Sequence, residues 1–147
     1  MILRPIAAAA AAVTLVACVP ASPTAPEDGP AQDSHFARFG EEVRPGGVVV
    51  RPLRLVEDSR CPQGVQCVQA GTVRIAVRIG AGGSAREAVL RLRDAEALGG
   101  GRVLWLVGAC PLAPPPGRPI AAGDYRFQLA VGREGASAPP PPICASY

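Results

Sequence analysis

The stretch Thr72-Val73-Arg74-Ile75-Ala76-Val77-Arg78-Ile79 decides the fold, because large apolar residues alternate in it with polar or small ones. The four large residues are all β-branched and occupy every second position. This period of two is typical of a strand with one buried and one solvated face. The stretch therefore predicts a β-strand that covers one side of a core.

A second stretch near the end of the chain repeats this alternation and begins after a glycine and Asp124; its apolar members are Tyr125, Phe127, Leu129 and Val131. Shorter candidate strands cover residues 36–39, 48–56, 88–93 and 103–107, each bounded by Gly, Pro or Asp. Glycine-rich connections at 81–84 and 99–101 favour hairpins over helical crossovers. We therefore expect an all-β domain, a mainly antiparallel β-sandwich of about six or seven short strands, with a small barrel as the second choice.

Residues 86–98 are the one stretch whose composition favours a helix. The alternation of Leu90 and Leu92 with arginines favours a strand instead, which leaves at most a single helical turn over residues 94–98. Trp105 is the natural large residue for the core between the two sheets.

The first eighteen residues have the layout of a signal peptide: a short cationic head with Arg4, an apolar stretch over residues 6–17, and a small residue before Cys18. Twelve helical residues rise only about 18 Å, which is too short for a hydrocarbon core of roughly 30 Å. The segment is therefore predicted to act as a signal peptide and not to remain as a membrane-spanning helix.

The four residues Leu15-Val16-Ala17-Cys18 resemble the lipobox of bacterial lipoproteins. The resemblance implies that residues 1–17 are removed and that acyl chains such as palmitate on Cys18 hold the protein on a membrane, since two or three chains anchor almost permanently. It also implies outer-membrane sorting in the cell envelope, because Val19 is not acidic. Ordinary secretion, with cleavage near Ala17 or Ala21, is the alternative.

The segment that follows Cys18 is rich in Pro, Ala and small polar residues and has few large apolar ones. Such a composition predicts a disordered tether over residues 18–34. Residues 35–147 then form a single β domain.

Four cysteines remain besides Cys18, an even number that predicts disulfides in an exported chain. Three pairings are possible. The simplest joins Cys61 to Cys67 across a short loop and Cys110 to Cys144 across a long one. A zinc site is disfavoured because the spacing contains no CxxC pair, so we expect no metal and no cofactor.

The run from Asp58 to Gly71, DSRCPQGVQCVQAG, resembles a signature of small uncharacterised bacterial lipoproteins: DSRCP, four residues, a cysteine, and a glycine four positions further on. The resemblance implies an exported all-β domain and adds no chemistry. One departure is Gln69, which stands where the resemblance leads us to expect a tryptophan.

This run reads in the first place as a rigid turn, with Asp58 accepting backbone N–H bonds and Arg60 pairing with it. The second interpretation is a recognition loop, because a disulfide-braced loop loses little entropy on binding. The residues that would carry recognition are Asp58, Arg60, Gln63, Gln66 and Gln69.

Catalytic arrangements find little support, so we expect no catalytic residues and no enzyme activity. The single histidine, His35, lies at the tether junction, where it is badly placed for a nucleophile–base pair. Neighbouring carboxylates are better explained as solvated turns than as a glycosidase pair.

All fifteen basic residues are arginines, and the formal net charge is only +3. Outward-facing arginines of the predicted strands (Arg74, Arg78, Arg91, Arg93 and Arg126) are expected to form a solvated sheet face, with contact to anionic lipid or polysaccharide as the alternative. Nothing indicates nucleic acid. The expected function is a membrane-anchored, non-catalytic binding or structural module with an unknown envelope protein or ligand as partner; an envelope hydrolase or inhibitor-like protein is the alternative.

Overall fold

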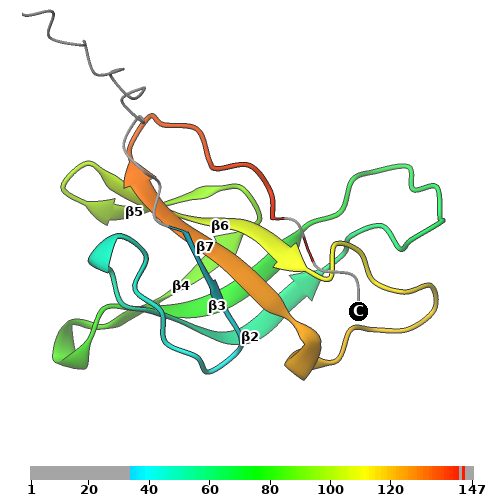
Figure 1. The fold of residues 1–147 in the computed structure, drawn as a ribbon, viewed down its shortest axis with the longest axis horizontal. Helices are drawn as coiled ribbons and strands as arrows, with labels where there is room; N and C mark the ends of the chain where they lie inside the picture. The colour runs from blue at the N-terminus through cyan, green and yellow to red at the C-terminus, as the bar shows by residue number, and fades with distance from the viewer. Residues whose placement is uncertain (1–33, 143, 145–147) are drawn as a thin grey trace, which may run out of the picture.

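The computed structural model describes residues 34–142 and residue 144 of the chain. Two sheets, both antiparallel, account for its regular structure (Figure 1). The predicted signal peptide, Cys18 and the greater part of the predicted tether lie outside the described residues.

The first sheet has four strands in the order β1-β7-β6-β5, and the second has three in the order β2-β3-β4. In chain order the strands are β1 (Ser34–Ala37), β2 (Val50–Asp58), β3 (Val73–Ile79), β4 (Arg86–Arg91), β5 (Ala95–Gly99), β6 (Arg102–Cys110) and β7 (Arg126–Arg133). Three short 3-10 turns, η1 (Pro45–Gly47), η2 (Gly82–Ser84) and η3 (Ala122–Asp124), lie in the connections. No α-helix occurs among the described residues, so the all-β prediction is confirmed.

The core lies between the two sheets, as expected for a β-sandwich. The predicted dry face of β3 is buried in it and packs with inward side chains of β6 and β7, among them Leu104, Leu106, Phe127 and Leu129. Tyr125 stacks on Phe127 with ring centroids 5.5 Å apart, and Phe39 contacts both rings. The alternation that predicted these two strands therefore marks the true core.

Trp105 is buried, but the expectation that it fills the core between the sheets is wrong. It belongs to a second, smaller apolar cluster with Val103, Val107 and Ala130 on the outer face of the four-stranded sheet. Ala138 packs against this cluster. The C-terminal segment thus covers part of the outer face, so β6 is buried on both sides.

The prolines near the C-terminus carry this covering segment across the sheet. Pro139 and Pro142 are buried while Pro140 and Pro141 are exposed, a spacing that matches the three residues per turn of polyproline II. A Cβ on Gly108 would come within 2.1 Å of Pro142, so the close approach depends on this glycine. The disulfide between Cys110 and Cys144 holds the end of the segment in place.

β5 was not predicted, since residues 94–98 read as a single helical turn. Arg93, with a φ of 67°, turns the chain after β4, and residues 95–99 then pair with β6 in the other sheet. Cross-strand pairing of this kind overrides the helix propensity of the alanines and Glu96.

Candidate functional site

The loop of residues 59–72 joins β2 to β3 and contains all but the first residue, Asp58, of the run that resembles the lipoprotein signature. At its base, the Ser59 N–H donates to the Thr72 carbonyl at 2.9 Å and the Thr72 N–H donates to the Ser59 hydroxyl at 3.1 Å. A Cβ on Gly71 would lie 1.6 Å from the Ser59 carbonyl oxygen. Only glycine therefore allows the two ends of the loop to approach each other this closely.

A disulfide between Cys61 and Cys67 closes the tip of this loop, with a Cα–Cα separation of 6.0 Å. Within it, the Val65 N–H donates to the Pro62 carbonyl, and Gly64 adopts a φ of 71° that favours glycine. Of the three possible pairings, the structure contains the predicted one, Cys61–Cys67 with Cys110–Cys144.

Asp58, Arg60 and Tyr125 form a polar cluster, called here the Asp58 cluster, where the loop leaves β2. The Arg60 guanidinium donates to both carboxylate oxygens of Asp58, at 2.9 and 2.7 Å, and the Tyr125 hydroxyl donates to Asp58 Oδ2 at 2.7 Å. The side chains of Asp58 and Arg60 keep only 8% of their surface exposed. Such a paired and nearly buried charge is a structural element.

Arg60 also connects the loop to the other sheet. Its Nη1 donates to the backbone carbonyls of Ala109 and Pro111, at 2.9 and 2.6 Å, at the end of β6. Its backbone N–H donates to Asp58 Oδ1 at 3.2 Å, which is the turn predicted from the sequence. One guanidinium therefore joins β2, its own loop and the end of β6.

The protonation states in the Asp58 cluster follow from these contacts. Burial acts to raise the pKa of Asp58, but hydrogen bonds from Arg60 and Tyr125 and the charge of Arg60 outweigh it and hold the pKa below its ordinary value of 3.8. Burial, and then the hydrogen bond to Asp58 and its charge, raise the pKa of Tyr125 to about 12. Asp58 is thus ionised and Tyr125 neutral over the physiological range.

The raised pKa of Tyr125 predicts a loss of stability in alkali. An unfolded tyrosine deprotonates near pH 10, so the contribution of Tyr125 is complete below pH 10 and disappears as the pH rises towards 12. We expect the free energy of unfolding to fall by about 1.4 kcal/mol between pH 9 and 11 from this group. Urea unfolding of the wild type and of Tyr125→Phe measures it: the variant should lack this part of the decline, and identical declines would contradict the assignment.

A second loop lies beside the braced loop at the same end of the sandwich (Figure 1). The Gln63 N–H donates to the Pro114 carbonyl at 3.2 Å. Neither residues 61–71 nor residues 111–117 include a charged side chain. We call these two segments together the loop end.

The loop end exposes apolar side chains to solvent. Val68 is fully exposed, Val65 is 49% exposed, and Leu112 is 58% exposed. Scattered exposed apolar residues are ordinary, but three on two touching, uncharged loops form a surface suited to contact with another molecule.

The five residues predicted for a recognition loop divide into two groups. Asp58 and Arg60 lie inside the Asp58 cluster, whereas Gln63, Gln66 and Gln69 are exposed on the loop. The role of Tyr125 was not predicted, because strand alternation already accounted for this residue. Residues 111–117 were not predicted as neighbours of the loop either. Only the position of the prolines directly after Cys110 pointed to a second loop there.

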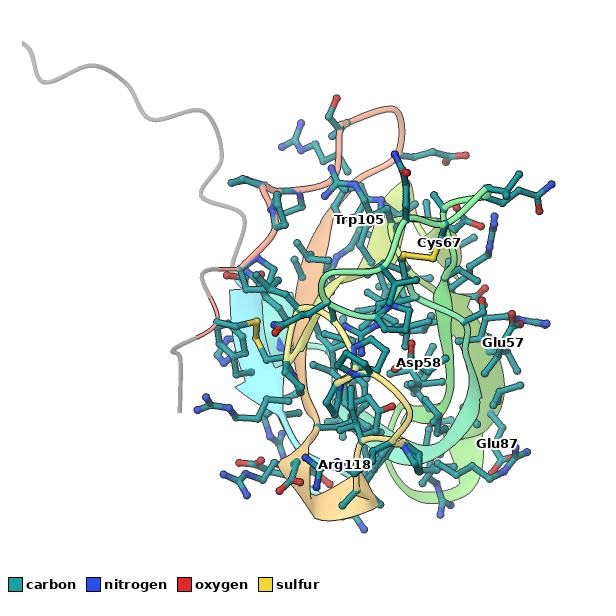
Figure 2. The ribbon with its side chains drawn as sticks, turned by 90° about the vertical axis from the view of Figure 1, so that its right-hand side faces the viewer. Glu57, Asp58, Cys67, Glu87, Trp105 and Arg118 are labelled. Atoms are coloured by element: carbon teal, nitrogen blue, oxygen red, sulfur yellow. A yellow bond between two sulfur atoms is a disulfide. The ribbon has the colours of Figure 1, made fainter. Side chains whose placement is uncertain are left out.

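The outer face of the three-stranded sheet is the second candidate surface. Residues that pair across the strands share this face, and they form three rows: Arg51-Arg78-Glu87, Arg54-Ala76-Val89 and Glu57-Arg74-Arg91. In a regular strand, residues three positions apart point to opposite faces. Two irregularities in β2, between Pro52 and Arg54 and between Leu55 and Glu57, instead keep Arg51, Arg54 and Glu57 on one face. Figure 2 shows Glu57 and Glu87 on the outer side of this sheet.

The prediction that five outward-facing arginines share one solvated sheet face is therefore correct only in part. Arg74, Arg78 and Arg91 lie on this face, whereas Arg93 lies between β4 and β5 and Arg126 lies in β7 of the other sheet. The two arginines that β2 adds were not foreseen, because its irregularities leave no period of two in the sequence.

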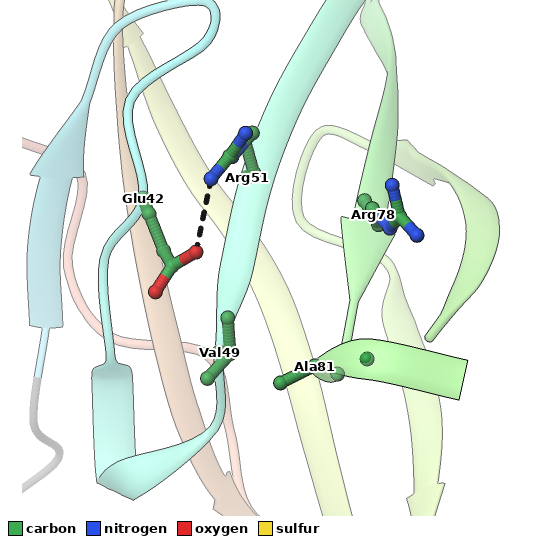
Figure 3. Close-up of a pocket in the computed structure, with 7 residues that line it drawn as sticks. Glu42, Val49, Arg51, Arg78 and Ala81 are labelled. Atoms are coloured by element: carbon green, nitrogen blue, oxygen red, sulfur yellow. Dashed lines mark hydrogen bonds and ion pairs between the residues drawn. The ribbon is translucent and has the colours of Figure 1, made fainter. Parts of the chain in front are cut away.

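A shallow hollow of about 270 Å³ lies at one corner of this face (Figure 3). It is lined by Glu42, Val49, Arg51, Arg78, Gly80, Ala81 and Gly82. Glu42 accepts hydrogen bonds from Arg51 at 3.1 Å and from Arg44 at 2.9 Å. The side chain of Arg78, on the other side of the hollow, makes no hydrogen bond or ion pair with the residues described.

Within residues 34–142 and 144, no three His, Cys, Asp or Glu side chains come together so that they could hold a metal ion. In the same part of the chain, no helix is long and apolar enough to cross a membrane. Comparison of the chain with protein-family models, with curated proteins and with solved structures found no match.

Proposed function

We propose that this protein is a lipoprotein of the bacterial cell envelope, anchored through Cys18, whose β domain is a non-catalytic binding module. The observation that carries the binding role is the loop end, where Val65, Val68 and Leu112 are exposed on uncharged loops. The disulfide and the Asp58 cluster brace these loops. Binding to such a surface costs little ordering entropy, because its shape already exists in the free protein.

The proposed localisation in the cell envelope rests on the signal-peptide layout and the lipobox resemblance of residues 1–18. The two disulfides support it, since such bonds persist in oxidising compartments and are rare in the cytosol. The partner is an envelope protein with an apolar contact surface, because an uncharged loop end offers no charge for recognition.

Site-specific photo-cross-linking in cells tests both parts of this proposal. A photoreactive amino acid replaces Val68 or Leu112, and we expect adducts with one and the same partner at both positions. A matched probe at Val89, which is 45% exposed on the outer face of the three-stranded sheet and away from the loop end, should not capture that partner. Equal capture at all three positions, or none at the loop end, would contradict the binding role.

The anchor is tested in the same cells by intact mass spectrometry of the membrane fraction. The expected product starts at Cys18, carries a lipid-sized mass, and gains the mass of four hydrogen atoms when its two disulfides are reduced. Cys18→Ser should abolish the lipid mass and release the protein from the membrane. An unmodified wild-type product would refute the anchor without affecting the cross-linking result.

A further inference from the structure

The outer face of the three-stranded sheet is the part of the described surface that the proposed function does not use. It is the face built from the three cross-strand rows described above. Five arginines and two glutamates give this face a net charge of +3, which equals the formal net charge of the whole chain. Its positive charge is therefore a local concentration on one open surface.

The positions of these charges follow a diagonal across the sheet. Arg51 and Arg54 lie on β2, Arg78 and Arg74 lie on β3, and Arg91 lies on β4. From the spacing of strands and of residues along them, the diagonal from Arg51 to Arg91 is about 17 Å long. We call these five residues the arginine band.

The two glutamates occupy the remaining two corners of this grid. Glu87 lies beside Arg78 in the first row, and Glu57 lies beside Arg74 in the third. The arginine band is thus bordered on both sides by a negative charge. A polyanion that left the diagonal would meet a carboxylate, so the arrangement selects one direction across the face.

Part of the arginine band has no counter-charge within the protein. Arg51 pairs with Glu42 at 3.1 Å, Arg74 with Glu57 at 3.6 Å and Arg91 with Asp94 at 3.4 Å, all between exposed side chains. Arg54 and Arg78 pair with no acidic residue in the part of the chain that the structure describes. Arg51 and Arg78 also lie directly opposite each other, an arrangement of like charges that is unfavourable unless an anion lies between them.

We propose that the arginine band binds a linear acidic polysaccharide that crosses the sheet along the diagonal. A guanidinium group can donate two parallel hydrogen bonds to one carboxylate or sulfate group. Several such contacts along one polymer strengthen its binding together, although each exposed contact alone is weak. The hollow between Arg51 and Arg78 receives one acidic sugar on the side of Arg78, since Arg51 is already paired with Glu42. This proposal concerns a different face from the loop end and does not depend on it.

The same face fits other polyanions less well. A single-stranded nucleic acid is usually held by aromatic side chains that stack on its bases, and the three rows contain no aromatic residue. A flat layer of anionic lipid headgroups would meet both bordering glutamates at once, whereas a single polymer strand avoids them.

Binding of labelled polygalacturonate tests the proposal. We use residues 18–147 with Cys18→Ser, which keep every residue that the structure describes, and measure fluorescence anisotropy at about 0.15 M salt, where surface charges are screened beyond about 8 Å. Arg54→Gln with Arg78→Gln should weaken binding about tenfold, since two charge contacts are lost. Glu87→Gln should tighten it about two- to threefold.

The matched control removes two arginines from elsewhere on the surface. Arg118 and Arg133 are exposed and, like Arg54 and Arg78, have no side-chain ion pair in the described structure. Arg118→Gln with Arg133→Gln should change the affinity less than twofold. An equal loss in both double variants would show attraction by net charge alone and overturn the proposal.

Two further probes separate the classes of partner. Vesicles that contain phosphatidylglycerol and a single-stranded oligonucleotide are compared with polygalacturonate at the same salt. Tighter binding of either probe, with the same loss in Arg54→Gln with Arg78→Gln, would overturn the assignment to polysaccharide. Circular dichroism establishes that each variant is folded, and failure of the loop-end cross-links would leave these results unchanged.

Discussion

Asp58→Ala is expected to lower the free energy of unfolding by about 3–5 kcal/mol. The substitution removes the only carboxylate that contacts Arg60 in the described structure and leaves a guanidinium with 8% of its side-chain surface exposed. An unpaired charge in such a place is costly, because water cannot replace the lost partner. Tyr125 would lose its acceptor as well. Urea unfolding at pH 7 measures the change.

Glu57→Ala is the matched control for this prediction. Glu57 is adjacent in sequence and also pairs with an arginine, but its side chain is 41% exposed and the ion pair with Arg74 is 3.6 Å long. Exposed ion pairs contribute at most about 1 kcal/mol, so the loss should be no larger. Similar losses in the two variants would show that the Asp58 cluster contributes no more than a surface pair.

Gly71→Ala is expected to cost about 3 kcal/mol and to open the base of the braced loop. The added methyl would lie 1.6 Å from the Ser59 carbonyl oxygen and 2.2 Å from its carbon, and both are backbone atoms. The two chain ends must therefore separate, which breaks the hydrogen bond between the Ser59 N–H and the Thr72 carbonyl. Hydrogen exchange of residues 59–72, together with urea unfolding, reports the change.

Gly83→Ala provides the comparison, because it makes the same chemical change in open space. Gly83 has an ordinary φ, and no atom lies within 4 Å of an added Cβ. Its effect on stability should be below about 0.5 kcal/mol. If Gly71→Ala were equally mild, the loop base would have to be far more adaptable than its contacts indicate.

Two strands show how far alternation alone predicts this fold. β3 and β7 have large apolar residues at every second position, and all of these residues are buried in the core between the sheets. Alternation works there because each strand has one face against the core. Alternation within one strand does not show which sheet that strand joins.

β5 and Trp105 show why other features of the fold could not be predicted from local sequence patterns. Residues 95–99 form a strand only because β6 offers an edge for pairing, and their own propensities favour a helix. Trp105 lies on the outer face because a distant segment around Ala138 covers it there. Both outcomes depend on contacts between parts of the chain that are far apart, which local patterns do not encode.

The candidate surfaces were predicted to different extents. Cysteine spacing led to the braced loop, because only one pairing joins residues close in sequence. The roles of Asp58 and Arg60 depend on Tyr125 and on the end of β6, which come together only in the folded chain. The arginine band needed the register of three strands, including two irregularities in β2.

The pairing of β1 with β7 sets the order in which this chain can fold. Ser34 pairs with Ala130, so the first and last strands of the described chain are neighbours in one sheet. Contacts between such distant residues form late, since the chain between them must first be gathered. The four-stranded sheet is therefore incomplete until β7, which ends at Arg133, has emerged. For a protein that is exported as proposed, this topology delays folding of the domain until β7 has been translocated.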